Sequence, residues 1–196
     1  MQQQCDAAER GCYAIGHVGV CCTTFSRLAN PPYRRHTDAA HPEFIVCLPD
    51  TSEKKTRKAL EANLMADHSV TLLVAWHCSG MMASLENPHS SMIWQYFEHT
   101  GAMSRLQALG FRKFSTCYRR FGTPYKKTNN VVMQLRCQWN VQEMQLHWET
   151  SSSDLGQVKT KHGWQSRSFL ASPYPRRLVS LWMKVILHAL ASKYAK

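Results

Sequence analysis

Residues 81–88 read Met-Met-Ala-Ser-Leu-Glu-Asn-Pro, a short apolar stretch that ends in a carboxylate, an amide and a proline. We predict a buried strand over 81–85, with Glu86, Asn87 and Pro88 at its carboxyl end. Pro88 restricts Asn87 to extended backbone conformations, which fixes the direction in which the strand ends. Packing explains Glu86 poorly, because glutamate is rarely buried without a partner. A role for Glu86 as the cap of a following helix is an open alternative.

The residues before this stretch place it in an α/β sheet. Residues 14–21, Ala-Ile-Gly-His-Val-Gly-Val-Cys, are apolar without helical period and predict a buried strand followed by a loop. A helix is expected from Thr51 or Ser52 to Gly80, with Ser52 as a good N-cap residue. Five of its residues fall on one broad face: Leu60, Leu64, Thr71, Leu72 and Ala75. The order strand, helix, strand favours an α/β sheet, whose ligands bind at the carboxyl ends of its strands.

The remaining segments are expected to complete one domain. Residues 29–51 hold four prolines and predict an irregular connection. Helical turns are expected at 91–98 and 102–109, and further strands at 111–121, 131–137 and 143–148. We expect a main region over 1–150, a loop over 151–172 and an amphipathic C-terminal helix over 173–196.

The composition is that of a globular protein. The chain has 196 residues, of which 44% are hydrophobic and 19% are charged. No apolar run approaches the roughly 20 residues that span a bilayer. The N-terminus lacks the pattern of a signal peptide. We therefore expect an intracellular protein without a membrane partner, nuclear in a eukaryotic host and otherwise cytoplasmic.

Cysteine and histidine are frequent but are not arranged as ligands. The eight cysteines are scattered, without Cys-x-x-Cys spacing, which favours reduced thiols over a disulfide framework. The chain also has ten histidines, yet no close ligand pair of the zinc type occurs. Cys137 and His147 are a weak candidate pair, and we expect no metal site. Gly-rich phosphate loops and the nucleophile elbow of serine hydrolases are absent from the sequence.

The charge balance points to a polyanion. The formal net charge is +11, and nucleic acid is the commonest partner of so basic a protein. The stretch Arg112–Lys127 carries six Lys or Arg in sixteen residues, interleaved with aromatic residues. Cations neutralise phosphates, and aromatic rings can stack on bases. A strand with a solvated basic face is the alternative explanation of the same pattern.

Cys22 is a candidate nucleophile. It follows the predicted strand over 14–21 and opens the loop Cys-Thr-Thr-Phe-Ser, from which a thiol can face a ligand. The reactive species is the thiolate, which Arg27 could help to stabilise. The alternative is a small buried residue beside Cys21.

Three segments, taken in order, resemble a diverged group of cytosine-C5 DNA methyltransferase-like proteins found in phages and protists. They are 17–27, which contains Cys-Cys-Thr-Thr-Phe-Ser; 85–94, which contains Leu-Glu-Asn-Pro; and 116–128, which begins Thr-Cys-Tyr-Arg-Arg-Phe-Gly. The similarity covers about residues 14–135. It implies a partial doubly wound, Rossmann-like sheet that lacks its N-terminal cofactor-binding strands and is followed by a C-terminal helix.

The resemblance also implies a mechanism and a set of contacts. Cys22 would add to C6 of a flipped-out cytosine, and Glu86 would hydrogen-bond the N3 and amino edge of the base. Asn87 and Pro88 would line the site of the methyl donor, S-adenosylmethionine. Five cations are the candidates for DNA contacts: Arg27, Arg119, Arg120, Lys126 and Lys127.

Two departures from the family pattern bear on activity. Cys21 stands where the family has a proline, so the nucleophile is ambiguous between Cys21 and Cys22. The Gly-rich turn that holds the methyl donor should precede Cys22 by many tens of residues, whereas only 21 residues stand there. We therefore expect an N-terminally truncated domain with an incomplete cofactor pocket and little or no methyl transfer. A non-catalytic, basic nucleic-acid-binding protein is the alternative, and a gene fragment without a selected function is a third reading.

Overall fold

The computed structural model describes residues 14–35, 40–118, 128–134, 157–160, 163–166 and 175–180, together with 183, 184, 187 and 191. The chain divides into two compact units. Unit 1 is Met1–Lys113 with Val131–Leu135, and unit 2 is Phe114–Asn130 with Arg136–Lys196. The strand endings predicted at Cys22 and Glu86 both belong to unit 1.

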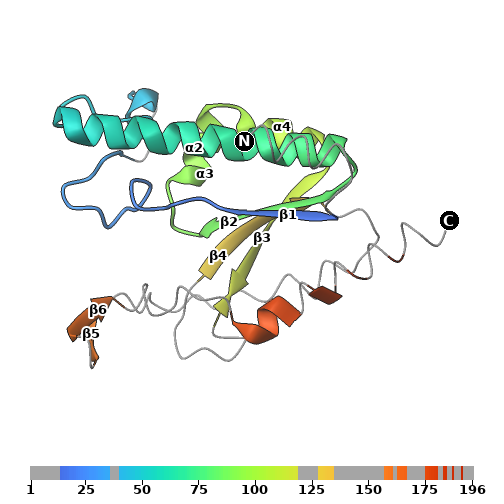
Figure 1. The fold of residues 1–196 in the computed structure, drawn as a ribbon. Helices are drawn as coiled ribbons and strands as arrows, with labels where there is room; N and C mark the ends of the chain where they lie inside the picture. The colour runs from blue at the N-terminus through green and yellow to red at the C-terminus, as the bar shows by residue number, and fades with distance from the viewer. Residues whose placement is uncertain are drawn as a thin grey trace. The chain divides into compact units, whose positions relative to one another are not determined.

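A four-stranded mixed sheet organises the fold (Figure 1). Its strands are β1 (Ile15–Gly19), β2 (Met82–Pro88), β3 (Phe111–Cys117) and β4 (Thr128–Gln134), arranged in the order β1-β2-β4-β3. Strands β1 and β2 are parallel, and the chain passes between them through the long helix α2 (Glu53–Cys78). The α/β class predicted from the sequence is thereby confirmed, and the doubly wound methyltransferase sheet stays a prediction.

Helix α2 has the predicted extent. It begins after Ser52, whose backbone is extended, although the Ser52 side chain makes no capping hydrogen bond. It ends at Cys78, with Ser79 as the C-cap residue, and Gly80 then turns the chain toward β2 with a φ of 75°, a conformation that glycine adopts without strain.

The broad face of α2 noted in the sequence is not the face that the structure buries. Leu60 and Leu64 are 50% and 56% exposed. The residues that α2 buries are smaller or more polar on average: Ala59, Asn63, Ala66, Ser69, Val70, Leu73 and Trp76. Small side chains let the helix lie close to the sheet. Asn63 is buried because it accepts a hydrogen bond from the buried Arg34.

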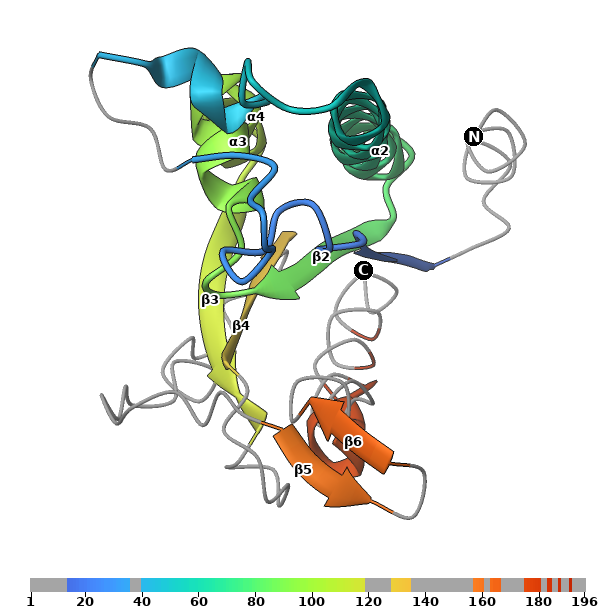
Figure 2. The same cartoon turned by 90° about the vertical axis from the view of Figure 1, so that its left-hand side faces the viewer.

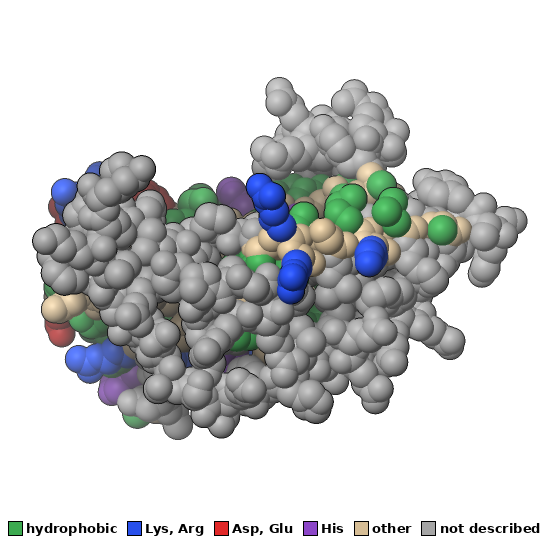
Figure 3. All heavy atoms as spheres, turned by 90° about the horizontal axis from the view of Figure 1, so that it is seen from below, with side chains coloured by type: hydrophobic (Ala, Val, Ile, Leu, Met, Phe, Trp, Pro, Cys, Tyr) green, Lys and Arg blue, Asp and Glu red, His purple; other side chains and the backbone are tan. Residues whose placement is uncertain are grey.

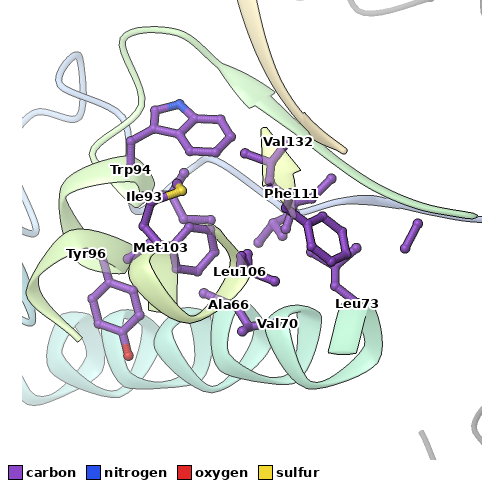
Figure 4. Packing of buried hydrophobic residues seen from close by; sticks show 14 of the residues in the cluster. Ala66, Val70, Leu73, Ile93, Trp94, Tyr96, Met103, Leu106, Phe111 and Val132 are labelled. Atoms are coloured by element: carbon purple, nitrogen blue, oxygen red, sulfur yellow. The ribbon is translucent and has the colours of Figure 1, made fainter. Parts of the chain in front are cut away.

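Two short helices complete the cover of the sheet in unit 1. These are α3 (Ile93–His99) and α4 (Ala102–Ala108), which agree with the predicted helical turns. Figures 1 and 2 show α2, α3 and α4 on the same side of the sheet. The core fills the space between them, where Ile93, Met103 and Leu106 meet Phe111 and Val132 (Figure 4).

Unit 2 contains a hairpin where a loop was expected. Strands β5 (Gln157–Thr160) and β6 (Gly163–Ser166) pair antiparallel, so the loop prediction for 151–172 is wrong over these residues. Residues 176–180 are helical, as predicted for the C-terminus. On the face drawn in Figure 3, described Lys and Arg side chains lie beside apolar ones. The strand predicted over 143–148 lies outside the described residues.

Two further structural findings concern the described residues as a group. None of their helices combines the length and the apolar character that crossing a bilayer requires. None of their five cysteines is part of a disulfide.

Candidate functional site

The two motifs meet at one edge of the sheet. The parallel register pairs Ile15 with Met82 and Gly19 with Glu86. Since parallel strands present their carboxyl ends at the same edge, the loop that leaves β1 and the end of β2 lie together. Cys22 comes three residues after the residue that pairs with Glu86. The predicted cysteine and carboxylate therefore stand at the ends of neighbouring strands.

Hydrogen bonds fasten the cysteine loop to the residues that follow Glu86. The Asn87 side chain donates from Nδ2 to the Val20 carbonyl across 2.8 Å. The Met92 backbone N–H donates to the Phe25 carbonyl, also at 2.8 Å. Within the loop, the Phe25 N–H donates to the Cys22 carbonyl at 3.1 Å and closes a turn. Hydrogen bonds before and after the two cysteines, at Val20 and at Phe25, therefore fix the position of the loop.

Glu86 belongs to strand β2 and does not cap a helix. Its side chain is 8% exposed, and Asn87 is fully buried. Helix α3 begins at Ile93 and has Met92 in the N-cap position. The alternative role of Glu86 as a helix cap is therefore wrong, and the structure places a buried carboxylate at the strand end.

The adjacent cysteines differ in environment. Cys21 is exposed, and its Sγ lies 3.3 Å from Thr23 Oγ1. Hydrogen bonds from the Thr23 side chain and then from its backbone N–H lower the pKa of the Cys21 thiol, against a smaller opposing effect of burial. Cys22 is half-buried. Because a thiolate is the reactive form, the contact with Thr23 activates the Cys21 thiol.

A buried arginine, Arg34, hydrogen-bonds the cysteine loop at Thr24, and the sequence analysis did not predict this role. Arg34 is 1% exposed and lies in the stretch that was expected to be an irregular connection. Its guanidinium stacks over the Phe25 ring at 3.9 Å. Burial lowers the pKa of Arg34 to about 10, although the charges of Cys47 and Tyr96 act in the opposite direction. Arginine is rarely buried, so no pattern in the sequence marks this one.

A part-buried polar contact lies beside the same ring. Tyr96 packs against Phe25 with ring centroids 5.7 Å apart. The Tyr96 hydroxyl donates to the Asp67 carboxylate on α2 at 3.0 and 3.1 Å, and Figure 4 shows this hydroxyl pointing toward the helix. Burial, and next the Asp67 charge, raise the pKa of Tyr96 to about 12.

The predicted nucleic-acid residues fall mostly outside the described part of the chain. Arg27 is described and is exposed in the cysteine loop. Four others lie outside the described residues: Arg119, Arg120, Lys126 and Lys127. The same is true of Cys137 and His147, the weak metal pair. Within the described residues, no three His, Cys, Asp or Glu side chains gather as metal ligands.

The residues that the resemblance assigns to the methyl donor have other contacts. Asn87 is fully buried and donates to Val20, and its Oδ1 is buried without a hydrogen-bond partner. The Pro88 carbonyl accepts from Ser91 N–H at 3.0 Å and from Trp94 Nε1 at 2.8 Å. These contacts hold the strand end in place, and the role of Asn87 and Pro88 toward S-adenosylmethionine stays a prediction.

Comparisons with known proteins add no relative to this description. No family model, no curated protein and no solved structure matches the chain. The geometry at the ends of β1 and β2 is therefore what bears on function, since a fold class alone does not imply one.

Proposed function

We propose that the β1–β2 edge is a cytosine site of the cytosine-C5 methyltransferase-like type, with Cys22 as nucleophile and Glu86 as the partner of the base. The observation that carries this proposal is the parallel register that pairs Gly19 with Glu86. This register places the loop that carries Cys22 and the carboxylate of Glu86 at the same edge of the sheet, as a shared site requires. The buried position of Glu86 in β2, which is not explained by helix capping, supports the same proposal.

The chemistry follows from the two side-chain types. The Cys22 thiolate forms a bond to C6 of cytosine, and the electrons of the C5–C6 double bond move toward C5. Glu86 hydrogen-bonds the N3 and amino edge and stabilises the charge that develops in the ring. In water, C5 then takes up a solvent proton. Loss of the original C5 hydrogen and departure of the thiolate return cytosine with its C5 hydrogen exchanged.

DNA is the proposed source of the base. The net charge of +11 suits a polyanion, and the exposed Arg27 follows the thiol within the same loop. A base in a duplex must leave its stack to reach such a site, which costs a few kcal/mol and is easier in single strands. S-adenosylmethionine would supply a methyl group for C5 when bound.

The direct test is hydrogen exchange at C5 in the absence of a methyl donor. The full chain is incubated with cytosine oligonucleotides, both single strands and a random-sequence duplex pool, labelled with tritium at C5. We expect release of tritium into water, reduced about 100-fold or more by Cys22→Ser or by Glu86→Gln. Cys78→Ser, which removes an exposed thiol at the far end of α2, is the matched control.

The outcomes separate the assignments. Release that is lost in Cys21→Ser and kept in Cys22→Ser would move the nucleophile by one residue. No release by the unmodified chain, or equal release by all variants, would contradict the cytosine site.

The alternative is a non-catalytic nucleic-acid-binding protein, which the charge of +11 favours. It predicts that the Cys22→Ala, Glu86→Gln double variant binds DNA as tightly as the unmodified chain. A loss of preference for cytosine-containing strands in the double variant would instead favour the base site. Fluorescence anisotropy with strands that contain or lack cytosine measures both outcomes.

A further inference from the structure

Arg34 is a buried cation in a cage of neutral acceptors. Its five N–H groups lie within hydrogen-bond distance of six acceptors, and the two hydrogens of Nη1 are shared among three of them. The acceptors are Thr24 O, Thr24 Oγ1, Ile45 O, Val46 O, Asn63 Oδ1 and Ala59 O. The ion pairs found among the described residues do not include Arg34. The guanidinium therefore binds carbonyl, hydroxyl and amide oxygens in the place of a carboxylate.

If Arg34 only filled space in the core, its buried charge would be an unfavourable choice. A buried charge without an opposite charge destabilises a fold, and an apolar side chain of similar length fills the same volume without that cost. The lowered pKa of Arg34, caused by its burial, reflects the same penalty. The planar guanidinium, unlike an apolar side chain, donates hydrogen bonds in several fixed directions, so it can hold several acceptors in place at once.

The segments that Arg34 joins are far apart in the chain. Ile45 and Val46 end the short 3-10 helix η1 (Pro42–Ile45), and Ala59 and Asn63 lie on α2. Thr24 lies in the cysteine loop and presents both its carbonyl and its hydroxyl to the guanidinium. The loop is in this way fixed to a helix that is itself packed on the sheet.

The contacts continue from Arg34 to the reactive end of the loop. The guanidinium stacks on Phe25, whose N–H donates to the Cys22 carbonyl and whose carbonyl accepts from Met92. Thr24 directly follows Thr23, which hydrogen-bonds the Cys21 thiol. A displacement of Thr24 thus changes the surroundings of both cysteines.

Building on the cytosine site proposed above, we propose that Arg34 is the positioning residue of that site. It holds Thr24 and Phe25 so that the two thiols are presented at the β1–β2 edge beside Glu86. It does not touch the base, and it acts through the loop. A residue with a merely structural role would change stability and leave the chemical behaviour of the thiols unaltered.

The test measures the thiols directly in the full chain. The rates of iodoacetamide alkylation at Cys21 and Cys22 are followed against pH, with the two sites resolved by mass spectrometry. In Arg34→Met and Arg34→Lys we expect the pKa of Cys21 to rise toward its ordinary value, and the half-buried Cys22 to react several-fold faster.

Leu73→Ala is the control for general destabilisation. Leu73 is fully buried, and it lies ten residues along α2 from Asn63, a rise of about 15 Å. We expect this variant to lower Tm and to leave the alkylation profiles as they are in the unmodified chain. Thr24→Val, which removes one acceptor and keeps the β-branched shape, gives a milder variant if the Arg34 substitutions do not fold.

The outcomes are distinct. Profiles in Arg34→Lys and Thr24→Val that match Leu73→Ala would overturn the positioning role and leave Arg34 as a structural residue. The alkylation experiment uses no nucleic acid, so its result does not depend on the result of the C5 exchange experiment. Failure of C5 exchange with altered alkylation would reject the cytosine site and keep the link between Arg34 and the thiols.

Discussion

Asn87 hydrogen-bonds the carbonyl of Val20 through its side-chain amide, one position beyond the last register pair of β1 and β2. The bond is 2.8 Å long and fully buried. It extends the connection between the two strands into the segment where β1 becomes the cysteine loop. A side chain of β2 thus fixes the residue that precedes Cys21.

The first prediction concerns this bond. Asn87→Ala leaves the buried Val20 carbonyl unpaired, and we expect a loss of about 1–3 kcal/mol in the free energy of unfolding. Urea denaturation followed by tryptophan fluorescence measures the change. A loss within a few tenths of a kcal/mol would mean that the carbonyl finds another partner.

The second prediction concerns the packing of α2 on β1. A Cβ at Gly16 would overlap the indole ring of Trp76, so Gly16→Ala should destabilise unit 1 by about 1–3 kcal/mol. Trp76→Phe makes room beside Gly16, and the double variant should be more stable than the sum of the single effects implies. Additive effects in that cycle would show that the two residues do not compete for space.

The third prediction concerns the pKa of Cys21. Thr23→Val removes the hydroxyl beside Sγ and should raise the pKa of Cys21 toward its ordinary value, because the hydroxyl stabilises the thiolate. The pH dependence of iodoacetamide alkylation at Cys21 measures this shift. Thr23→Ser keeps the hydroxyl and should retain the lowered pKa, so an equal rise in both variants would contradict the role of this hydrogen bond.

The fourth prediction concerns alkaline stability. The pKa of Tyr96 is raised from 10 to about 12 in the folded chain, so the folded state holds this proton more tightly than the unfolded state does. The resulting stabilisation is complete below pH 10 and is lost as the pH rises toward 12. Tyr96→Phe cannot titrate, so its stability should decline less across that window.

A matched measurement isolates the Tyr96 effect. The lowered pKa of Arg34 acts in the opposite direction over this pH range. Its largest cause, burial, is common to both proteins, whereas the smaller opposing effect of the Tyr96 charge is absent from the variant. Chemical denaturation of the Tyr96→Phe variant and the unmodified chain at pH 9 and pH 11 should show the difference in slope. Parallel declines would contradict the raised pKa.

The sequence predicted the order and extent of the elements in unit 1 well. Gly80 and the apolar stretch at 81–85 defined the helix end and the next strand, because both depend on local conformation. The sequence did not predict which face of α2 is buried. Leu60 and Leu64 are more hydrophobic than Asn63, yet the long-range partner of Asn63 is Arg34, and contacts of that kind are not encoded in helical periodicity.

The candidate site was predictable in part for the same reason. Cys22 and Glu86 were placed at strand ends by local pattern, and the parallel register then brings those ends together. Arg34 was invisible, since its role depends on contacts made 10 to 29 residues away along the chain. The lowered pKa of Cys21 likewise depends on the rotamer of Thr23, which a residue pattern does not contain.

The place of β4 in the sheet has a consequence for how the chain is made. β4 lies between β2 and β3, although it is the last of the four strands in the sequence. Until residues 128–134 have left the ribosome, β2 and β3 each present an unpaired edge, and exposed edges pair readily with other chains. The same gap would remain in any shortened chain that ends after β3. Expression without aggregation should therefore require residues through β4, even for work directed only at Cys22 and Glu86.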